Sequence, residues 1–425
     1  MSKVFDRINR RRGVWVGLFL MTLIYIFSYF QRVAIPGTIF NQLQHDLILS
    51  SAEVALLGGL FLYVYGGMQV FAGMLVDRFG PMRVILAGGI LLSVGSILFP
   101  LSHSLWMLYA TRIVVGLGAS VMFISLVKEL DLRFSDNNFS ALLGIMVFAG
   151  YAGGLMGTRP FDAAATAFGW RTALLWVGVG TAVVVAISAL VFRGLSEPER
   201  DHVAQPLLPV LANVLKNRLC YPAITMEVIG FANYFVFQGI IGKKFLEDCC
   251  GLASSTAASW TLLLSFTCMT SVGLSGVMSR LIGNRRKPIL ILSSLSGVLA
   301  PCTGLLILGR GSQWILPCFL LFGISGGTTQ IVNSSIKELN QPEFVGSAVG
   351  VANGATYLGV AVFATLAGLG LDHFASHAVR TATAIHYPMQ AYRTILLGCL
   401  FVGVIAFVSS LLVRETSGKN MWAHD

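Results

Sequence analysis

The chain has 425 residues, of which 55% are hydrophobic and 11% are charged, and its mean hydropathy is +0.77. This composition excludes a soluble enzyme of this size and indicates an integral membrane protein. The formal net charge of +10 does not indicate nucleic-acid binding, because the basic residues are scattered through short loops with no large polar domain to carry such a surface.

Twelve apolar segments follow one another, each about long enough to cross a bilayer as a helix. They cover about residues 14–40, 54–72, 84–101, 105–127, 140–160, 172–192, 220–241, 260–278, 288–308, 314–336, 347–369 and 394–413. The first segment lacks a convincing cleavage site, so we expect it to be retained. We therefore predict an all-α integral membrane protein with a first half at 1–193, a central cytoplasmic loop at 194–219 and a second half at 220–425.

The distribution of basic residues predicts the orientation of these segments. With a cytoplasmic amino end, 20 of the 29 Lys and Arg residues fall in cytoplasmic loops and 7 in outside loops, while Arg32 and Arg112 stay within segments. This bias follows the positive-inside rule. We expect a multi-pass protein of a plasma (inner) membrane with both termini in the cytoplasm.

A short charged connection joins the second and third segments. It contains Gly73, Asp77, Arg78, Gly80 and Arg83. Gly73 would let helices approach closely, Gly80 permits a turn with positive φ, and Asp77 can accept hydrogen bonds at a helix start. This stretch resembles the loop signature of the major facilitator superfamily, and the resemblance implies a conformational latch between two halves.

The charged connection recurs later in the chain. Residues 276–287 repeat its glycine spacing 203 positions further on, but Arg280 stands where the first copy has Asp77. Further echoes occur after each fourth segment (128–130 and 337–339) and before each sixth segment (170–172 and 392–394). A duplicated six-helix unit explains all of them. The resemblance implies two pseudo-symmetric six-helix bundles that alternate access to a central site.

Arg32 lies within the first segment, where a guanidinium needs an anion, a carbonyl-lined cavity or water. Tyr29 precedes it by three residues, and this Tyr-x-x-Arg pattern resembles the first helix of organic-anion and organophosphate members of the superfamily. The resemblance implies that Arg32 binds the charge of a substrate and that Tyr29 orients it. A snorkelling or internally paired arginine is the alternative reading.

The seventh segment lacks a second arginine, because aligning Tyr29 with Tyr234 places Phe237 opposite Arg32. This departure puts a sugar-phosphate substrate in doubt.

Other residues of the seventh segment and of the loop after it are candidates for substrate binding. Asn233, Tyr234 and Gln238 offer neutral hydrogen bonds. Lys243 and Lys244 either attract an anion at the outer mouth or are simply solvated at a helix end.

Two further charged residues are candidates for proton coupling. Glu227 is the only acid well inside a predicted segment, and a structural pair with a nearby base is the alternative. Arg112 begins an Arg-x-x-x-Gly-x-Gly pattern that resembles the fourth helix of the family, where this position serves structural pairing or proton movement. The glycine-rich fifth segment (150–157) lacks the proline of the family's exporters, which favours uptake or exchange over efflux.

No enzyme motif, metal-ligand spacing or ATP-binding loop is apparent, so we expect no cofactor and no catalysis. The seven cysteines are interpreted as apolar packing residues. We predict a monomeric secondary transporter of a small organic anion, a carboxylate-type metabolite, coupled to protons. A neutral polar solute or sugar, a drug or metabolite exporter, and a receptor without transport are the alternatives.

Overall fold

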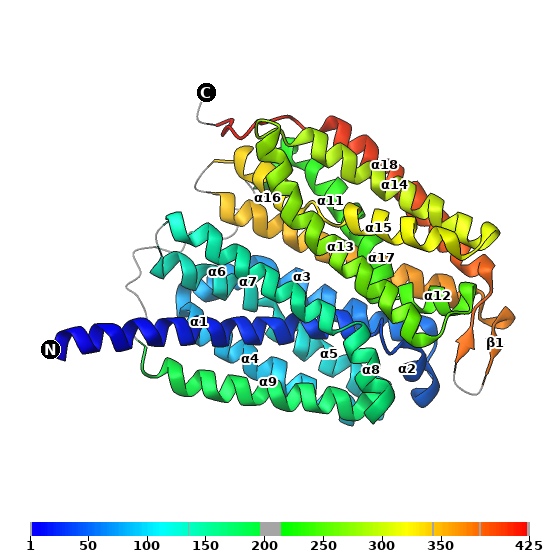
Figure 1. The fold of residues 1–425 in the computed structure, drawn as a ribbon, viewed down its shortest axis with the longest axis horizontal. Coiled ribbons are helices and arrows are strands. Elements are labelled where there is room, and N and C mark those ends of the chain that lie inside the picture. The colour runs from blue at the N-terminus through cyan, green and yellow to red at the C-terminus, as the bar shows by residue number, and fades with distance from the viewer. Residues whose placement is uncertain (1, 135, 196–213, 342–343, 382–383, 423–425) are drawn as a thin grey trace.

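The computed structural model describes residues 2–134, 136–195, 214–341, 344–381 and 384–422 (Figure 1). Within these residues, twelve helical spans are long and apolar enough to cross a membrane, which confirms the predicted number. Most of the predicted central loop lies outside the described residues.

We call the described residues up to 195 the first half of the protein. Its helices are α1 (Ser2–Ala34), α2 (Phe40–Leu47), α3 (Ser51–Phe79), α4 (Pro81–Leu101), α5 (Leu105–Ser120), α6 (Met122–Arg133), α7 (Asp136–Met156), α8 (Arg159–Phe168) and α9 (Trp170–Phe192).

The second half comprises the described residues from 214 onward. Its elements are η1 (Arg218–Cys220), α11 (Tyr221–Gly239), α12 (Gly242–Cys250), α13 (Ser254–Leu281), α14 (Lys287–Arg310), η2 (Ser312–Trp314), α15 (Ile315–Ser325), α16 (Thr329–Glu338), α17 (Val345–His373), η4 (Ala375–His377), β1 (Val379–Arg380), β2 (Ile385–His386) and α18 (Met389–Leu412).

Several predicted segments prove to be interrupted helices. The first ends at Ala34, before Pro36, and α2 follows as a separate short helix. The fifth is broken at Thr158, and Pro160 lies in the first turn of α8, where its missing N–H leaves no helical hydrogen bond unmade. The tenth is broken at Gly326 and Gly327, between α15 and α16. Hydropathy alone does not locate these breaks, because an average over a whole segment does not register an interruption of one or a few residues.

The charged connection after α3 has the local geometry that its sequence predicts. Gly80 has φ +89°, which a residue with a side chain rarely adopts, and α4 begins immediately afterwards at Pro81. At its other end, α3 begins with a capping box: Ser50 Oγ accepts a hydrogen bond from the Glu53 N–H, and the Glu53 carboxylate accepts one from the Ser50 N–H.

The two halves lie side by side, and α3 packs along α17 between them (Figure 1). Both ends of the chain lie at the left of Figure 1, and we call this the terminal end. The helices α2 and α12 and the β1–β2 hairpin lie at the right, which we call the distal end.

The seam between α3 and α17 is tight near the distal end and loosens toward the terminal end. A methyl group added at Gly368 would lie 2.6 Å from Ala55 Cβ, and one at Gly66 would lie 3.0 Å from the Gly354 carbonyl oxygen. A methyl group at Gly73 would meet no atom within 4 Å. The close helix approach expected at Gly73 is therefore absent in this conformation.

Candidate functional site

Arg32 lies near the carboxyl end of α1 and is only 3% exposed. Its guanidinium carbon lies over three tyrosine rings, 4.6 Å from the centroid of Tyr29, 4.3 Å from that of Tyr65 and 4.7 Å from that of Tyr357. Arg32 Nη1 donates a 2.6 Å hydrogen bond to the Tyr357 hydroxyl, and Arg32 Nε has no hydrogen-bond partner. Among the described residues, no carboxylate forms an ion pair with Arg32, so an aromatic cage holds a cation without a counter-ion.

Both halves contribute to this aromatic cage. Tyr29 on α1 and Tyr65 on α3 come from the first half, whereas Tyr357 on α17 comes from the second. The rings of Tyr65 and Tyr357 meet edge to face at 4.6 Å, and Phe231 of α11 packs on Tyr357 at 5.8 Å. Sequence reasoning found Arg32 and Tyr29, and it missed Tyr65, which lies in an apolar segment.

The α11 candidates are buried but bind mainly within the second half. Asn233 donates to the Cys399 carbonyl of α18 at 3.0 Å, and Gln238 donates to Ser265 of α13 at 3.2 Å, which leaves one acceptor oxygen unpaired on each amide. Tyr234 packs on Phe231, the ring that also packs on Tyr357. Of these residues, Tyr234 is therefore the one linked by ring contacts to the Arg32 cage.

Phe237, the position opposite Arg32 in the internal alignment, packs in the core of the second half. Its ring stacks on Phe322 at 4.5 Å and meets Phe245 edge to face at 5.8 Å.

Glu227 of α11 is 4% exposed and accepts hydrogen bonds from the hydroxyls of Thr328 at 3.1 Å and Thr329 at 2.6 Å. Within the described part of the chain it forms no ion pair, so the structural pair with a nearby base is not seen. The spans of the structure extend past the predicted segments and contain further buried acids. Asp162 and Glu129, which are 1% and 2% exposed, also lie within helical spans.

Arg112 is fully buried on α5 and donates to backbone carbonyls of two other helices. Its Nε contacts the Leu57 carbonyl at 3.0 Å and its Nη1 contacts the Gln31 carbonyl at 3.2 Å, while Phe61 lies under the guanidinium at 4.8 Å. These bonds fix the backbone next to Arg32. They are the contacts of a structural residue, and a part for Arg112 in proton movement stays a prediction.

Lys243 and Lys244 begin α12 at the distal end and are 5% and 1% exposed. Lys243 Nζ lies 2.6 Å from the Asp162 carboxylate and 2.7 Å from the Thr38 carbonyl oxygen, both in the first half. Lys244 Nζ lies 2.7 Å from the Asn41 side-chain oxygen and 3.5 Å from the Asp248 carboxylate. The structure therefore does not leave these charges free at a solvated mouth, because both are engaged by fixed partners.

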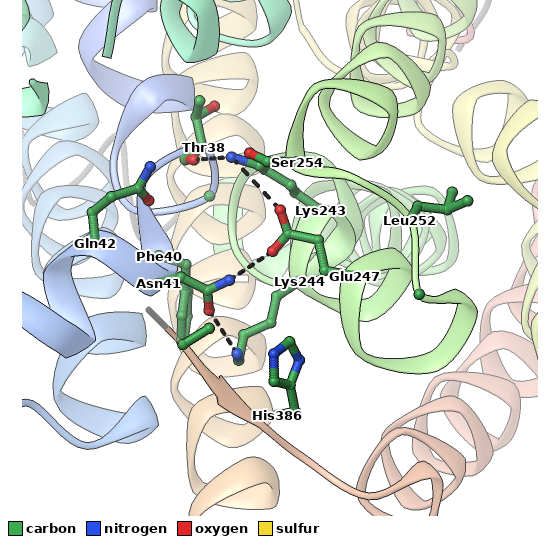
Figure 2. Close-up of a pocket in the computed structure, with 13 residues that line it drawn as sticks. Thr38, Phe40, Asn41, Gln42, Lys243, Lys244, Glu247, Leu252, Ser254 and His386 are labelled. Carbon is green, nitrogen blue, oxygen red and sulfur yellow. Dashed lines mark hydrogen bonds and ion pairs between the residues drawn. The ribbon is translucent and has the colours of Figure 1, made fainter. Parts of the chain in front are cut away.

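Figure 2 shows that side chains from both halves meet around these lysines, beside a cavity of about 400 Å³. Asn41 of α2 donates to Glu247 at 2.7 Å while accepting from Lys244. The Gly37 N–H also donates to the Gly239 carbonyl at 2.9 Å, a backbone bond between the halves. Burial raises the pKa of Glu247 and lowers the pKa of Lys244. We call Thr38, Asn41, Asp162, Lys243, Lys244 and Glu247 the distal cluster.

A second cavity, of about 540 Å³, opens between α7 of the first half and α13 and α16 of the second. Arg280, Arg286, Gln330 and Ser334 line it together with Tyr151. Arg286 is paired with Glu338 at 2.7 Å, and Arg280 is exposed.

This second cavity reaches the Arg32 cage through Tyr151, whose ring lies 5.2 Å from that of Tyr29. The cage is thus approached from the terminal end, while the distal cluster lies across the other end.

In the predicted latch, Asp77 forms an ion pair with Lys128 of its own half at 2.9 Å, and Arg78 lies over the Phe79 ring at 5.3 Å. With Gly80 in the turn, this gives the connection a defined shape. A latch function of Gly73, Asp77, Arg78, Gly80 and Arg83 stays a prediction.

Twelve spans in two helical halves, with a buried arginine cage to which both halves contribute, define a polytopic membrane protein. The sequence profile of the Major Facilitator Superfamily matches residues 21–362. The chain belongs to this superfamily.

Several curated relatives share part of the chain. A probable sulfoacetate transporter of Cupriavidus necator is 24% identical over 48% of this chain and 46% of its own. Monocarboxylate transporter 4 of Rattus norvegicus is 27% identical over 45% and 40%, respectively. A chloramphenicol resistance protein of Pseudomonas aeruginosa is 26% identical over 62% and 60%. The match covers less than two thirds of the length of each of these relatives.

Solved structures resemble the whole fold. A bacterial homolog to the human lysosomal transporter Spinster, in an inward-facing and unoccupied conformation, has a TM-score of 0.72 at 17% identity and covers 94% of this chain and 98% of its own. A mutant of the nucleoside transporter NupG has a TM-score of 0.73 at 12% identity and covers 94% and 100%. At these identities the likeness shows the fold alone.

Proposed function

We propose that the protein transports a small organic anion of the carboxylate type by alternating access between its two halves. The observation that carries this proposal is Arg32, a buried guanidinium with three tyrosine rings around it and no carboxylate partner among the described residues. A charged side chain at this depth is costly unless something compensates its charge. Aromatic faces and one phenol oxygen compensate it only in part, and an anionic substrate completes the compensation.

The charge of the site favours a substrate with one negative group. Phe237, at the position opposite Arg32, packs against Phe322 and Phe245, so the second half provides no matching arginine there. A single guanidinium binds a carboxylate or sulfonate in bidentate fashion, whereas a phosphate dianion would remain half neutralised. Tyr29 and Tyr65 provide apolar faces for a short organic body.

The arrangement of the two ends supports alternating access. The distal cluster joins the halves on one side of Arg32, and the 540 Å³ cavity separates α7 from α13 on the other. A rocking motion that breaks the first and closes the second would expose Arg32 to the opposite side of the membrane. The basic loops support a cytoplasmic location for the terminal end in an inner membrane, and the two halves make a monomer sufficient.

Glu227 is our candidate for proton coupling. It is buried in α11, and its hydrogen-bond partners among the described residues are the hydroxyls of Thr328 and Thr329. A carboxylate that lacks a cation partner in the membrane is a natural proton carrier. Transport of the anion together with a proton would reduce the net charge that crosses the bilayer.

The named activities of two relatives agree with an anionic substrate, since one is a probable sulfoacetate transporter and the other a monocarboxylate transporter. The chloramphenicol resistance protein favours a second candidate, export of a neutral compound. In that case Arg32 would be held internally by its tyrosines.

Thermal stabilisation of the purified protein separates these candidates. A ligand that binds only the folded protein raises its Tm. We expect short carboxylates and sulfonates to raise the Tm, and sugars, sugar phosphates and chloramphenicol not to. In Arg32→Gln the carboxylate effect should disappear, and uptake of the same anion into proteoliposomes should fall to background.

Arg171→Gln is the matched control. This arginine also lies on an aromatic ring, Trp170, and donates to the carbonyls of Pro100 and Ser102, but it is remote from Arg32 in the chain and bonds elsewhere. It should leave the ligand response unchanged. Equal carboxylate binding by Arg32→Gln and the parent protein would refute the anion site, and stabilisation by a neutral compound would favour the second candidate.

A further inference from the structure

We propose that Tyr357 completes the anion site from the second half, so that one bound carboxylate bridges the two halves of the protein. This inference rests on the proposed function, because it assumes that Arg32 binds the anion. It adds a residue that positions the substrate and makes substrate binding a contact between the halves.

Arg32 and Tyr357 both have hydrogen-bond donors without an acceptor among the described residues. Tyr357 Oη accepts from Arg32 Nη1 at 2.6 Å, and a phenol that accepts one hydrogen bond still has its own O–H to donate. Within the described residues, the Tyr357 hydroxyl donates to no acceptor, and Arg32 Nε is also unpaired. Unused donors of Arg32 and Tyr357 therefore lie next to each other with no acceptor, which is the environment that a carboxylate requires.

Tyr357 is more exposed than the residues around it. It lies near the middle of α17, and its ring contacts Arg32, Tyr65 and Phe231, all in the interior. Arg32 and Tyr65 are each 3% exposed, but Tyr357 remains partly exposed. Tyr357 thus keeps accessible surface beside buried neighbours, as expected of a side chain that contacts a ligand.

Tyr357 lies on the seam between the two halves. Arg32 belongs to α1 of the first half, whereas Tyr357 belongs to α17, the helix of the second half that packs along α3. Tyr357 lies one turn from Gly354 toward the distal end. At Gly354 the helices are close, because a methyl group on Gly66 would be only 3.0 Å from the Gly354 carbonyl oxygen. A carboxylate held by Arg32 and Tyr357 together would thus join the halves within the closely packed part of the seam, between Gly354 and Gly368.

The test compares Tyr357→Phe with Tyr65→Phe. Both variants keep an aromatic ring on the Arg32 guanidinium, and only the first removes the hydroxyl that bonds to it. A hydrogen bond to a charged group typically changes a binding constant by about tenfold or more. With acetate or another carboxylate that stabilises the parent protein, we expect Kd to rise about tenfold or more in Tyr357→Phe and less than about twofold in Tyr65→Phe.

A conformational readout separates bridging from a merely structural role. Spin labels at Gly144→Cys and Gly276→Cys, in a background without native cysteines, report the separation of α7 and α13 at the terminal end. Both glycines have open space around them, so the labels are tolerated. Saturating carboxylate should shorten this distance in the parent and in Tyr65→Phe, and leave it unchanged in Tyr357→Phe.

The outcomes distinguish this inference from the proposed function. If Arg32→Gln binds carboxylate as well as the parent does, the anion site is wrong, and the bridge is wrong with it. If Arg32→Gln loses binding but Tyr357→Phe keeps the parent's Kd and distance change, only the bridge is wrong. If Tyr357→Phe binds carboxylate more weakly but still shows the parent's shortening of the α7–α13 distance, the bridge is also wrong, because another residue would then hold the halves together.

Discussion

Asp162→Asn should open the distal end of the protein. Asp162 of α8 is 1% exposed, and its carboxylate accepts from Lys243 of α12 at 2.6 Å and from Ser254 at 2.9 Å. The substitution keeps the size of the side chain but removes its charge. Lys243 would then be buried in the distal cluster without its ion-pair partner.

The magnitude follows from the burial of both partners. Removing one member of a buried ion pair typically costs about 3–5 kcal/mol, because the remaining charge stays desolvated. We expect the lower end of this range, since the Thr38 carbonyl still accepts from Lys243 at 2.7 Å. Only the closed distal end brings Asp162 and Lys243 together, so the cost falls on that conformation alone. About 3 kcal/mol shifts the equilibrium between closed and open distal ends by more than about 100-fold.

The assay is the distance between spin labels at two exposed distal positions, His45→Cys in the first half and Thr256→Cys in the second, in a background without native cysteines. Asp162→Asn should convert a short distance into a long one. Arg159→Gln is the control, because Arg159 is 39% exposed and lies 3.4 Å from the same carboxylate, so its removal should shift the equilibrium only slightly.

A rescue variant tests the reasoning further. Replacing both charges, as Asp162→Leu with Lys243→Met, should restore much of the closed state, because no unpaired charge is then buried. The reasoning is refuted if Asp162→Asn keeps the short distance, or if Arg159→Gln opens the distal end to the same extent.

Three more predictions follow from the described contacts. Glu227→Gln should abolish acidification-driven uptake while leaving exchange of labelled for unlabelled anion intact; loss of both in a folded protein would make the residue structural. Arg280→Gln should raise KM for anion added at the terminal side several-fold at low salt and not at high salt, whereas Arg285→Gln, a neighbouring exposed arginine that does not line the cavity, should do neither. Burial alone would raise the pKa of Glu415, but hydrogen bonds from the backbone N–H groups of Arg286 and nearby residues lower it below its ordinary 4.5. The docking of the carboxyl-terminal segment that this carboxylate stabilises should therefore weaken as pH falls below about 4.5, and amide hydrogen exchange in Glu415→Gln should lack that pH dependence.

Features that depend on neighbouring residues in the chain were predictable from the sequence. Hydropathy predicts the twelve spans, and the φ of +89° at Gly80, followed by Pro81 at the start of α4, is a turn that local sequence encodes. Arg32 was recognisable because an isolated arginine in an apolar segment requires an explanation. Its need for an anion, a carbonyl-lined cavity or water could be stated without knowing its neighbours.

The partners of these residues could not be predicted, because they come from distant parts of the chain. Tyr65 looks like any aromatic residue of an apolar segment until α3 brings it to Arg32. Lys243 and Lys244 suggested a solvated mouth because they follow a predicted span, yet α12 turns them inward to meet Asp162 and Asn41. Asp162 itself lay just past a predicted boundary, in residues that hydropathy assigned to a loop.

Acidic residues at the two ends of the α3–α17 seam form different kinds of contact. At the distal end, the Asp372 carboxylate of the second half accepts from the backbone N–H groups of Ser51 at 2.7 Å and Ala52 at 2.9 Å, the first residues of α3 in the first half. This contact satisfies free N–H groups at a helix start and places a negative charge at the positive end of its dipole. At the terminal end, Asp77 forms an ion pair with Lys128 of its own half.

The Arg32–Tyr357 contact lies between the distal and terminal ends of this seam. On its distal side, the halves are joined by Asp372 and the distal cluster; on its terminal side, the seam loosens, and a methyl group at Gly73 would meet no atom within 4 Å. An anion bound at this contact would add a contact between the halves one turn from the last close approach of the seam, at Gly66 and Gly354. Its binding energy therefore favours closure of the seam toward the terminal end, and closure there is the step that an alternating-access transporter must couple to substrate.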